Sequence, residues 1–141
     1  MAITSAICSS FKQQILVEGH NLTNGADSIK LALYTSSATL GAGTTVFVTT
    51  GQATGTNYSS GGSALTNVTP ALSGTTAVCD FADLTFGTAT VTARGCLIYN
   101  STNGNKALCA IDFGGDKTST AGDFTVVFPS ATATGAIIRL A

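Results

Sequence analysis

The first residues of the chain carry apolar side chains at a helical spacing. One stripe recurs about every four residues and consists of Ile7, Cys8, Phe11, Ile15 and Leu16. This spacing predicts a short amphipathic helix over residues 4–18. Thr4 or Ser5 can cap its first turn, and Gly19 can end it. No other part of the chain has a convincing helical pattern.

After the helix the pattern changes to alternation with a period of two, which is typical of half-buried strands. Ile29, Leu31 and Leu33 alternate with their neighbours in this way. The pattern predicts strands at residues 29–34, 44–50, 63–66, 75–81, 84–86, 88–92, 95–100, 106–113, 124–128 and 136–140.

The connections between these strands are short and rich in Gly, Ser, Thr and Asn. Parallel strands would need crossover connections of a dozen or more residues, so the sheets are expected to be antiparallel. The expected fold class is therefore all-β: an antiparallel, jelly-roll-like β-sandwich with one short N-terminal helix. Residues 1–141 form one domain of suitable size, in which residues 1–20 are the N-terminal helical segment.

The dipeptide Asn103-Gly104 is the clearest local turn signal, because both residues tolerate the positive φ of a two-residue type I′ turn. Such a turn fixes the register of the hairpin that it closes. It predicts two cross-strand pairs: Ile98 with Cys109, and Cys96 with Ile111. All four side chains then share one face, which we expect to be the core.

Residues 49–62, TTGQATGTNYSSGG, are the longest segment without a clear period. Long loops on rigid scaffolds often bind partners. This Gly-rich loop can equally wrap across the sheet, with Tyr58 filling a gap at the surface.

The composition shows which surface the sandwich presents to water. Charged residues make up 9% of the chain, against about 25% in an average protein, whereas there are 24 Thr, 13 Ser and 16 Gly. A hydroxyl-rich surface is easier to desolvate than an ionic one, so it suits a protein whose surface is covered by neighbours. A Thr-rich secreted β domain would have the same composition. The net charge of −1 and the lack of a basic run argue against nucleic acid as a partner.

The N-terminal sequence has no positive residue before Ile7 and no uninterrupted apolar run, so we do not expect a signal peptide. No segment approaches about 20 consecutive apolar residues, and we expect no membrane partner. These features predict synthesis in a cytoplasm. The four cysteines are then expected to be free thiols.

The residue types that carry catalysis do not form a recognisable pattern. His20, the only histidine, lies twelve residues after Cys8, or about 18 Å along a continuous helix, too far for a nucleophile and its base. His20 is expected at the helix end or in the connection to the first strand. The doublet Asp80 and Asp83 suits turn formation better than acid–base catalysis.

A calcium loop is the metal site that the sequence comes closest to. The segment DFGGDKTSTAGD carries Asp112, Asp116 and Asp123, but their spacing departs from that of a calcium-binding loop. We therefore expect no catalytic residues, no cofactor and no metal.

Six segments carry a resemblance to small β-rich virion proteins of tailed bacteriophages, and together they cover almost the whole chain. They are SFKQQILVEGHNL, IKLALYTSSATLG, GTNYSSGGSALTNVTP, VCDFADLTF, ARGCLIYNST and AIIRLA. The resemblance implies a non-enzymatic capsid decoration or cement protein. Such a protein sits on the outer surface of the assembled capsid, bridges major capsid subunits, and often forms homotrimers or other homo-oligomers.

Other functions remain open at this stage. A tail or neck component, such as an adaptor, a tube protein or a fibre-attachment protein, is the first alternative. A carbohydrate-binding fibre module is the second, in which Tyr34, Tyr58 or Tyr99 would stack on sugar rings. For the interface we select six residues, three from the helix and three from the loop: Phe11, Gln14, Ile15, Asn57, Tyr58 and Ser59. Phe11 and Ile15 can alternatively cover one open end of the sandwich.

Overall fold

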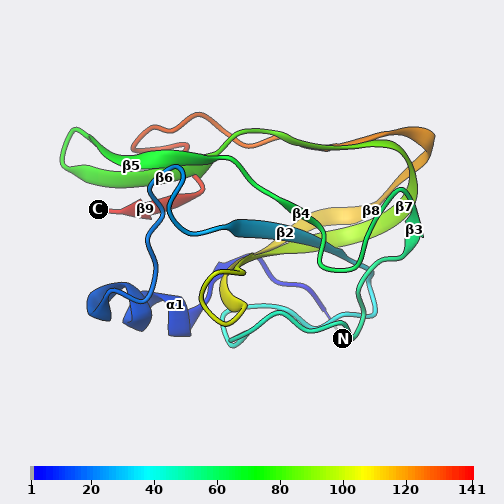
Figure 1. Cartoon of the computed structure of the whole chain (residues 1–141), viewed down its shortest axis with the longest axis horizontal. Helices are drawn as coiled ribbons and strands as arrows, with labels where there is room; N and C mark the ends of the chain where they lie inside the picture. Colours follow the sequence, from blue (N-terminus) through cyan, green and yellow to red (C-terminus); the bar gives the residue numbers. More distant parts are fainter. Residues whose placement is uncertain (1) are drawn as a thin grey trace.

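Two antiparallel β-sheets lie in two layers, and one short helix lies at one end of the molecule (Figure 1). The computed structural model describes residues 2–141. Its elements are β1 (Ala6–Ile7), α1 (Ser9–Gln14), the 3-10 turn η1 (Ile15–Val17), β2 (Ile29–Tyr34), β3 (Gly55–Thr56), β4 (Ser63–Ala64), β5 (Asn67–Ser73), β6 (Thr76–Phe81), β7 (Leu84–Asn100), β8 (Lys106–Val126) and β9 (Ile138–Leu140). The predicted all-β sandwich with one short N-terminal helix is confirmed. No helix among residues 2–141 is long and apolar enough to cross a bilayer.

The larger sheet has six strands in the order β1-β8-β7-β2-β4, with β3 also paired to β7, and the smaller sheet has the order β5-β6-β9. A jelly roll divides eight strands between two Greek keys, whereas here one long hairpin of β7 and β8 provides most of the pairing. This hairpin bends over at one end of the molecule, so that its strands run through both layers (Figure 1).

The predicted hairpin register is confirmed, but the predicted turn is wrong. Ile98 pairs with Cys109 and Cys96 pairs with Ile111, as expected. The pairing then shifts between Ile98 and Tyr99, so residues 101–105 form a longer loop. Positive φ falls on Gly104 (64°) and Asn105 (56°), one position later than in the expected turn. The bulge absorbs the extra residue without changing the register in the core.

The N-terminal helix is shorter than predicted. Residues 2–7 are extended, because β1 pairs with β8 and the Thr4 amide donates to the Leu40 carbonyl. Neither Thr4 nor Ser5 caps the helix, since Cys8 is the N-cap residue and makes no side-chain cap. At the other end Glu18 adopts the left-handed conformation, and the Gly19 amide donates to the Gln14 carbonyl. The backbone N–H and C=O groups of β1 find hydrogen-bond partners in β8, just as they would in a further turn of helix.

Several strand boundaries differ from the predictions. The three predicted strands between 84 and 100 are one strand, β7, and β8 runs through the polar segment 113–123. Segment 44–50 makes a single bridge, from Val46 to Lys106. Strand β5 was not predicted because it contains Pro70, which is tolerated there on an edge strand at a bulge.

The segment 49–62 packs closely on its own sandwich. The Tyr58 hydroxyl accepts a hydrogen bond from the Leu33 amide at 2.8 Å and donates to Gln52 Oε1 at 3.1 Å. A Cβ on Gly55 would lie 2.0 Å from the Thr90 carbonyl oxygen, so β3 approaches β7 too closely for any side chain. The segment therefore packs along the sheet edge, and Tyr58 fills the gap between the two. This is one of the two roles expected for the segment.

Gly62→Ala is predicted to destabilise the protein by more than about 2 kcal/mol. Its φ is +73°, and the new Cβ would lie 1.7 Å from the Leu31 carbonyl oxygen. Gly43→Ala is the control, because nothing lies within 4 Å of that Cβ and its φ is not positive. Urea unfolding of both variants measures the difference, and equal midpoints would contradict the packing described for this loop.

Candidate interaction surfaces

The outer face of the β7–β8 hairpin is covered by exposed threonines. We call this surface the threonine face, and it consists of Thr85, Thr90, Thr92, Thr118 and Thr125. Their hydroxyls pair across the strands at 2.9 Å (Thr85 with Thr125) and 2.8 Å (Thr92 with Thr118). Alternation explains the face, because the residues between these threonines, such as Phe86 and Val91, are buried.

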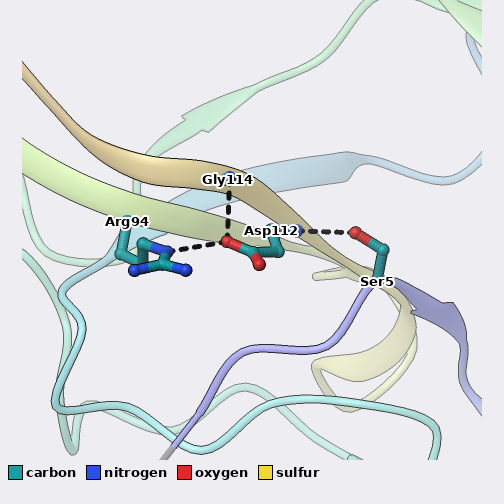
Figure 2. Close-up of polar contacts among 4 residues, drawn as sticks. All are labelled: Ser5, Arg94, Asp112 and Gly114. Atoms are coloured by element: carbon teal, nitrogen blue, oxygen red, sulfur yellow. Dashed lines mark hydrogen bonds and ion pairs between the residues drawn. The ribbon is translucent and has the colours of Figure 1, made fainter.

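An ion pair joins β7 to β8 (Figure 2). Arg94 Nε donates to Asp112 Oδ1 at 2.9 Å, and the Gly114 amide donates to the same oxygen at 3.0 Å. The Arg94 hydrogen bond, aided by the Gly114 amide, lowers the pKa of Asp112 below its usual value. The Asp112 amide donates to Ser5 Oγ at 2.8 Å. Asp112 therefore links Ser5, just before β1, and Arg94 of β7 to β8.

A second polar cluster joins the N-terminal segment to the sandwich. His20 Nε2 lies 2.8 Å from Gln14 Oε1, and His20 Nδ1 lies 3.0 Å from Asn100 Nδ2. Asn100 is completely buried and also donates to Asp27 Oδ2 at 2.7 Å. His20 thus lies in the connection to the first long strand, as expected, and it contacts no cysteine thiol by hydrogen bond.

The partners of Asn100 determine the tautomer of His20. Asn100 Oδ1 accepts hydrogen bonds from the Thr102 and Asn103 amides, so its Nδ2 is the donor towards His20. His20 Nδ1 must then accept, and Nε2 carries the proton that is donated to Gln14. Burial is the main cause that lowers the pKa of His20 below 6.5, with Asp27 opposing and Lys106 adding to the shift. A neutral imidazole is the form that this network stabilises.

The four thiols lie in the core and are free. Burial raises the pKa of Cys8 and of Cys79 to about 11, that of Cys96 to about 12, and that of Cys109 well above its usual value. Because the thiolate is the reactive form, none of these groups is activated as a nucleophile near neutral pH.

The carboxylates that the sequence singled out have separate roles. Asp83 Oδ1 accepts from the Phe128 amide at 2.8 Å, a long-range contact between the turn before β7 and the segment after β8. Asp80 is buried, with 1% of its surface exposed, and only its Oδ1 has a partner, the Phe81 amide. Burial raises the pKa of Asp80. Among residues 2–141, no three His, Cys, Asp or Glu side chains are arranged to hold a metal ion.

The three helix residues selected for an interface lie mainly against the sandwich. Phe11 is buried and its ring lies 5.0 Å from that of His20, while Ile15 is half-buried against the core. Gln14 is engaged with His20. Phe11 therefore cannot touch a partner directly, and the alternative that it covers one end of the sandwich describes its position. The exposed apolar residues of this segment are Leu16 and Val17, although Leu16 belongs by spacing to the apolar stripe that was expected to face the sandwich.

The loop residues selected for an interface are divided between surface and core. Asn57 and Ser59 are exposed, and Asn57 Nδ2 donates to the Thr88 carbonyl at 2.9 Å. Tyr58 is buried and cannot contact a partner directly. Tyr34 and Tyr99 are buried as well, so none of the three tyrosines offers its ring to a sugar.

An apolar groove of about 570 Å³ lies along β8 and the segment that follows it. Ile111, Phe113, Phe124, Val126, Val127, Phe128, Pro129 and Ile137 supply its apolar lining, and Lys117 and Asp123 are its charged residues. No pattern in the sequence indicated this groove, because it arises only when the two halves of β8 fold towards each other.

Comparison of the chain with protein-family models, with curated proteins and with solved structures finds no match. The function must therefore be inferred from the residues and surfaces described above.

Lowering the pH is predicted to destabilise the protein through His20. Because the pKa of His20 is lowered on folding, the unfolded chain takes up the proton first. The stabilisation is complete above pH 6.5 and is lost as the pH falls from 6.5 through the folded-state pKa. His20→Gln, which can still accept and donate, should remove this part of the pH profile of the unfolding free energy. Parallel profiles for the two proteins would contradict it.

Asp80→Asn is predicted to raise the free energy of unfolding at pH 7 by about 1 kcal/mol, since it removes a buried charge and keeps the Phe81 contact. Because folding raises the pKa of Asp80, the gain is present at neutral pH and disappears as the pH falls towards 3.8. Asp116→Asn, at an exposed position, is the control and should change little. Equal stabilities of the Asp80→Asn variant and the wild type across this range would refute the prediction.

Proposed function

We infer that this chain is a structural virion protein of a tailed bacteriophage, a capsid decoration or cement protein that binds the outer surface of the assembled capsid. It bridges neighbouring major capsid subunits and takes part in no reaction of its own. The observation that carries the proposal is the threonine face on a charge-poor β-sandwich, together with the resemblance of the six sequence segments to phage virion proteins.

The threonine face supports this role through the low cost of covering it. Four of its five hydroxyls pair with one another across the strands at 2.8–2.9 Å, and that of Thr90 accepts from the Ala121 amide. A neighbour can therefore cover these hydroxyls without leaving ions unpaired. The long pairing of β7 with β8 fixes the face in position. A rigid and neutral surface loses little conformational entropy on binding.

The repetition of sites on a capsid supports it further. A protein that binds only the assembled lattice stabilises that lattice by mass action. Each contact can be weak, because many copies act on one shell and a copy that touches two subunits gains effective concentration. A modest surface of this kind is therefore sufficient for a cement protein.

The copy number in purified virions tests the position of the protein. We expect quantitative mass spectrometry to find it at a number comparable with that of the major capsid protein. A copy number of about six or twelve would instead place it at the tail or neck axis, where rings of that symmetry occur. Its absence from virions would refute the proposal.

A paired substitution tests the threonine face itself. Thr85→Lys with Thr92→Lys, at two threonines of this face that lie outside the apolar groove, adds two buried positive charges to any interface there and is expected to reduce occupancy on capsids at least about tenfold. Thr39→Lys, at an exposed threonine on a loop outside this face, is the control. Co-sedimentation with capsids that lack the protein gives the readout, and equal occupancy of all variants would remove the threonine face from the proposal.

A further inference from the structure

The apolar groove beside β8 is wide enough for side chains and is not filled by the chain itself. Its volume of about 570 Å³ lies within the range of sites that bury ligands. Val127 lines it with 72% of its surface exposed, although the neighbouring Val126 and Phe128 are buried. A valine that is mostly exposed next to an apolar groove marks a surface whose burial against a partner would be favourable.

The edge of β8 argues against an added strand as the occupant. Beyond Ala110 this edge has no other strand partner among residues 2–141. Two bulges distort it: residues 113–116 lie opposite Arg94, and residues 120–121 lie opposite Thr90. Bulges of this kind protect edges from further pairing. The groove is therefore suited to inserted side chains rather than to main-chain pairing.

The same molecule exposes a compact pair of apolar side chains at another site. Leu16 is 83% exposed and Val17 is 64% exposed, at the end of the N-terminal helical segment. They project from η1, which is fixed to the sandwich through Phe11 and the His20 cluster. Because this segment is already fixed in the free protein, its insertion into a groove of another molecule would cost little conformational entropy.

The charges next to these two sites are complementary. Glu18, the only glutamate in the chain, directly follows Val17. Neither charged residue of the groove, Lys117 or Asp123, makes an ion pair within residues 2–141. The Asp123 carboxylate accepts a hydrogen bond from the Thr88 amide, whereas the Lys117 side chain has no hydrogen-bond partner there. Lys117 is thus the charge in the groove that lacks a partner within residues 2–141, and its sign is opposite to that of Glu18. In a chain with 9% charged residues such a match narrows the choice of occupant.

We propose that the groove of one copy receives Leu16 and Val17 of a second copy of this chain, with Glu18 of the inserted segment facing Lys117. The two contacting surfaces differ, so the contact is heterologous: the copy that inserts its apolar pair keeps a free groove, and the copy that receives it keeps a free apolar pair. Such contacts close into rings or extend as chains. Thr118 and Thr125 of the threonine face also line this groove, so the proposed capsid contact and the proposed self-contact share part of one surface. Self-association is tested with the purified chain alone, so its outcome is read separately from capsid binding.

The first experiment is sedimentation analysis of the full-length chain over a wide range of concentration. We expect reversible self-association in the wild type. Leu16→Asp and Val127→Asp, each at an exposed position on one of the two surfaces, should each weaken it at least about tenfold. Leu72→Asp, at a residue that is 75% exposed outside both surfaces, is the matched control and should associate as the wild type does.

Mixing the two defective variants tests the heterologous geometry. The Leu16→Asp copy keeps its groove and the Val127→Asp copy keeps its apolar pair, so the mixture should form one-to-one dimers although each alone is monomeric. Lys117→Glu or Glu18→Lys alone should weaken association, and the double exchange should restore it. A wild type that is monomeric throughout, an equal loss in the Leu72→Asp control, or no dimer in the mixture would overturn the proposal.

Discussion

The pairing of β7 with β8 is the interaction on which the rest of the structure depends. This hairpin bends through both layers, so it gives the larger sheet its centre and also reaches the side of the smaller sheet. β1, β2 and β3 all pair with one of its two strands. The threonine face lies on its outer side, and the apolar groove forms where β8 folds back. Both candidate surfaces are thus products of one bent hairpin.

The sequence predicted those parts of the fold that depend on local alternation. Ile29, Leu31 and Leu33 are fully buried in β2, and the pairing of Cys96 and Ile98 with β8 has the predicted register. Local rules were less successful where tertiary pairing overrides them. Thr4 and Ser5 could cap a helix, but β8 offers their segment a strand partner instead. Strand β5, which contains Pro70, was not predicted. A proline is compatible with a strand only at a position that needs no backbone N–H donor.

The candidate surfaces could be predicted only in part. A hydroxyl-rich surface follows from the composition, but the gathering of threonines on one face requires the strands that the sequence divided into pieces. Tyr58 lies in a Gly-rich loop, where an aromatic ring suggests partner binding. Its hydroxyl instead accepts the hydrogen bond of the Leu33 amide. Leu16 belongs to the helical stripe by spacing, but the change to a 3-10 turn at Ile15 leaves it outside. One altered turn thus moves a side chain from core to solvent.

Under the proposed function, the threonine face has a consequence for the conditions in which a capsid would keep its outer layer. Attraction between ions weakens as the Debye length shrinks from about 30 Å in dilute water to about 8 Å at physiological ionic strength. Hydroxyl and apolar contacts do not depend on this screening. The affinity of a capsid layer bound through such a face would be almost the same at physiological and at very low ionic strength. Release of the particle from a lysed cell into dilute surroundings would therefore not weaken the binding.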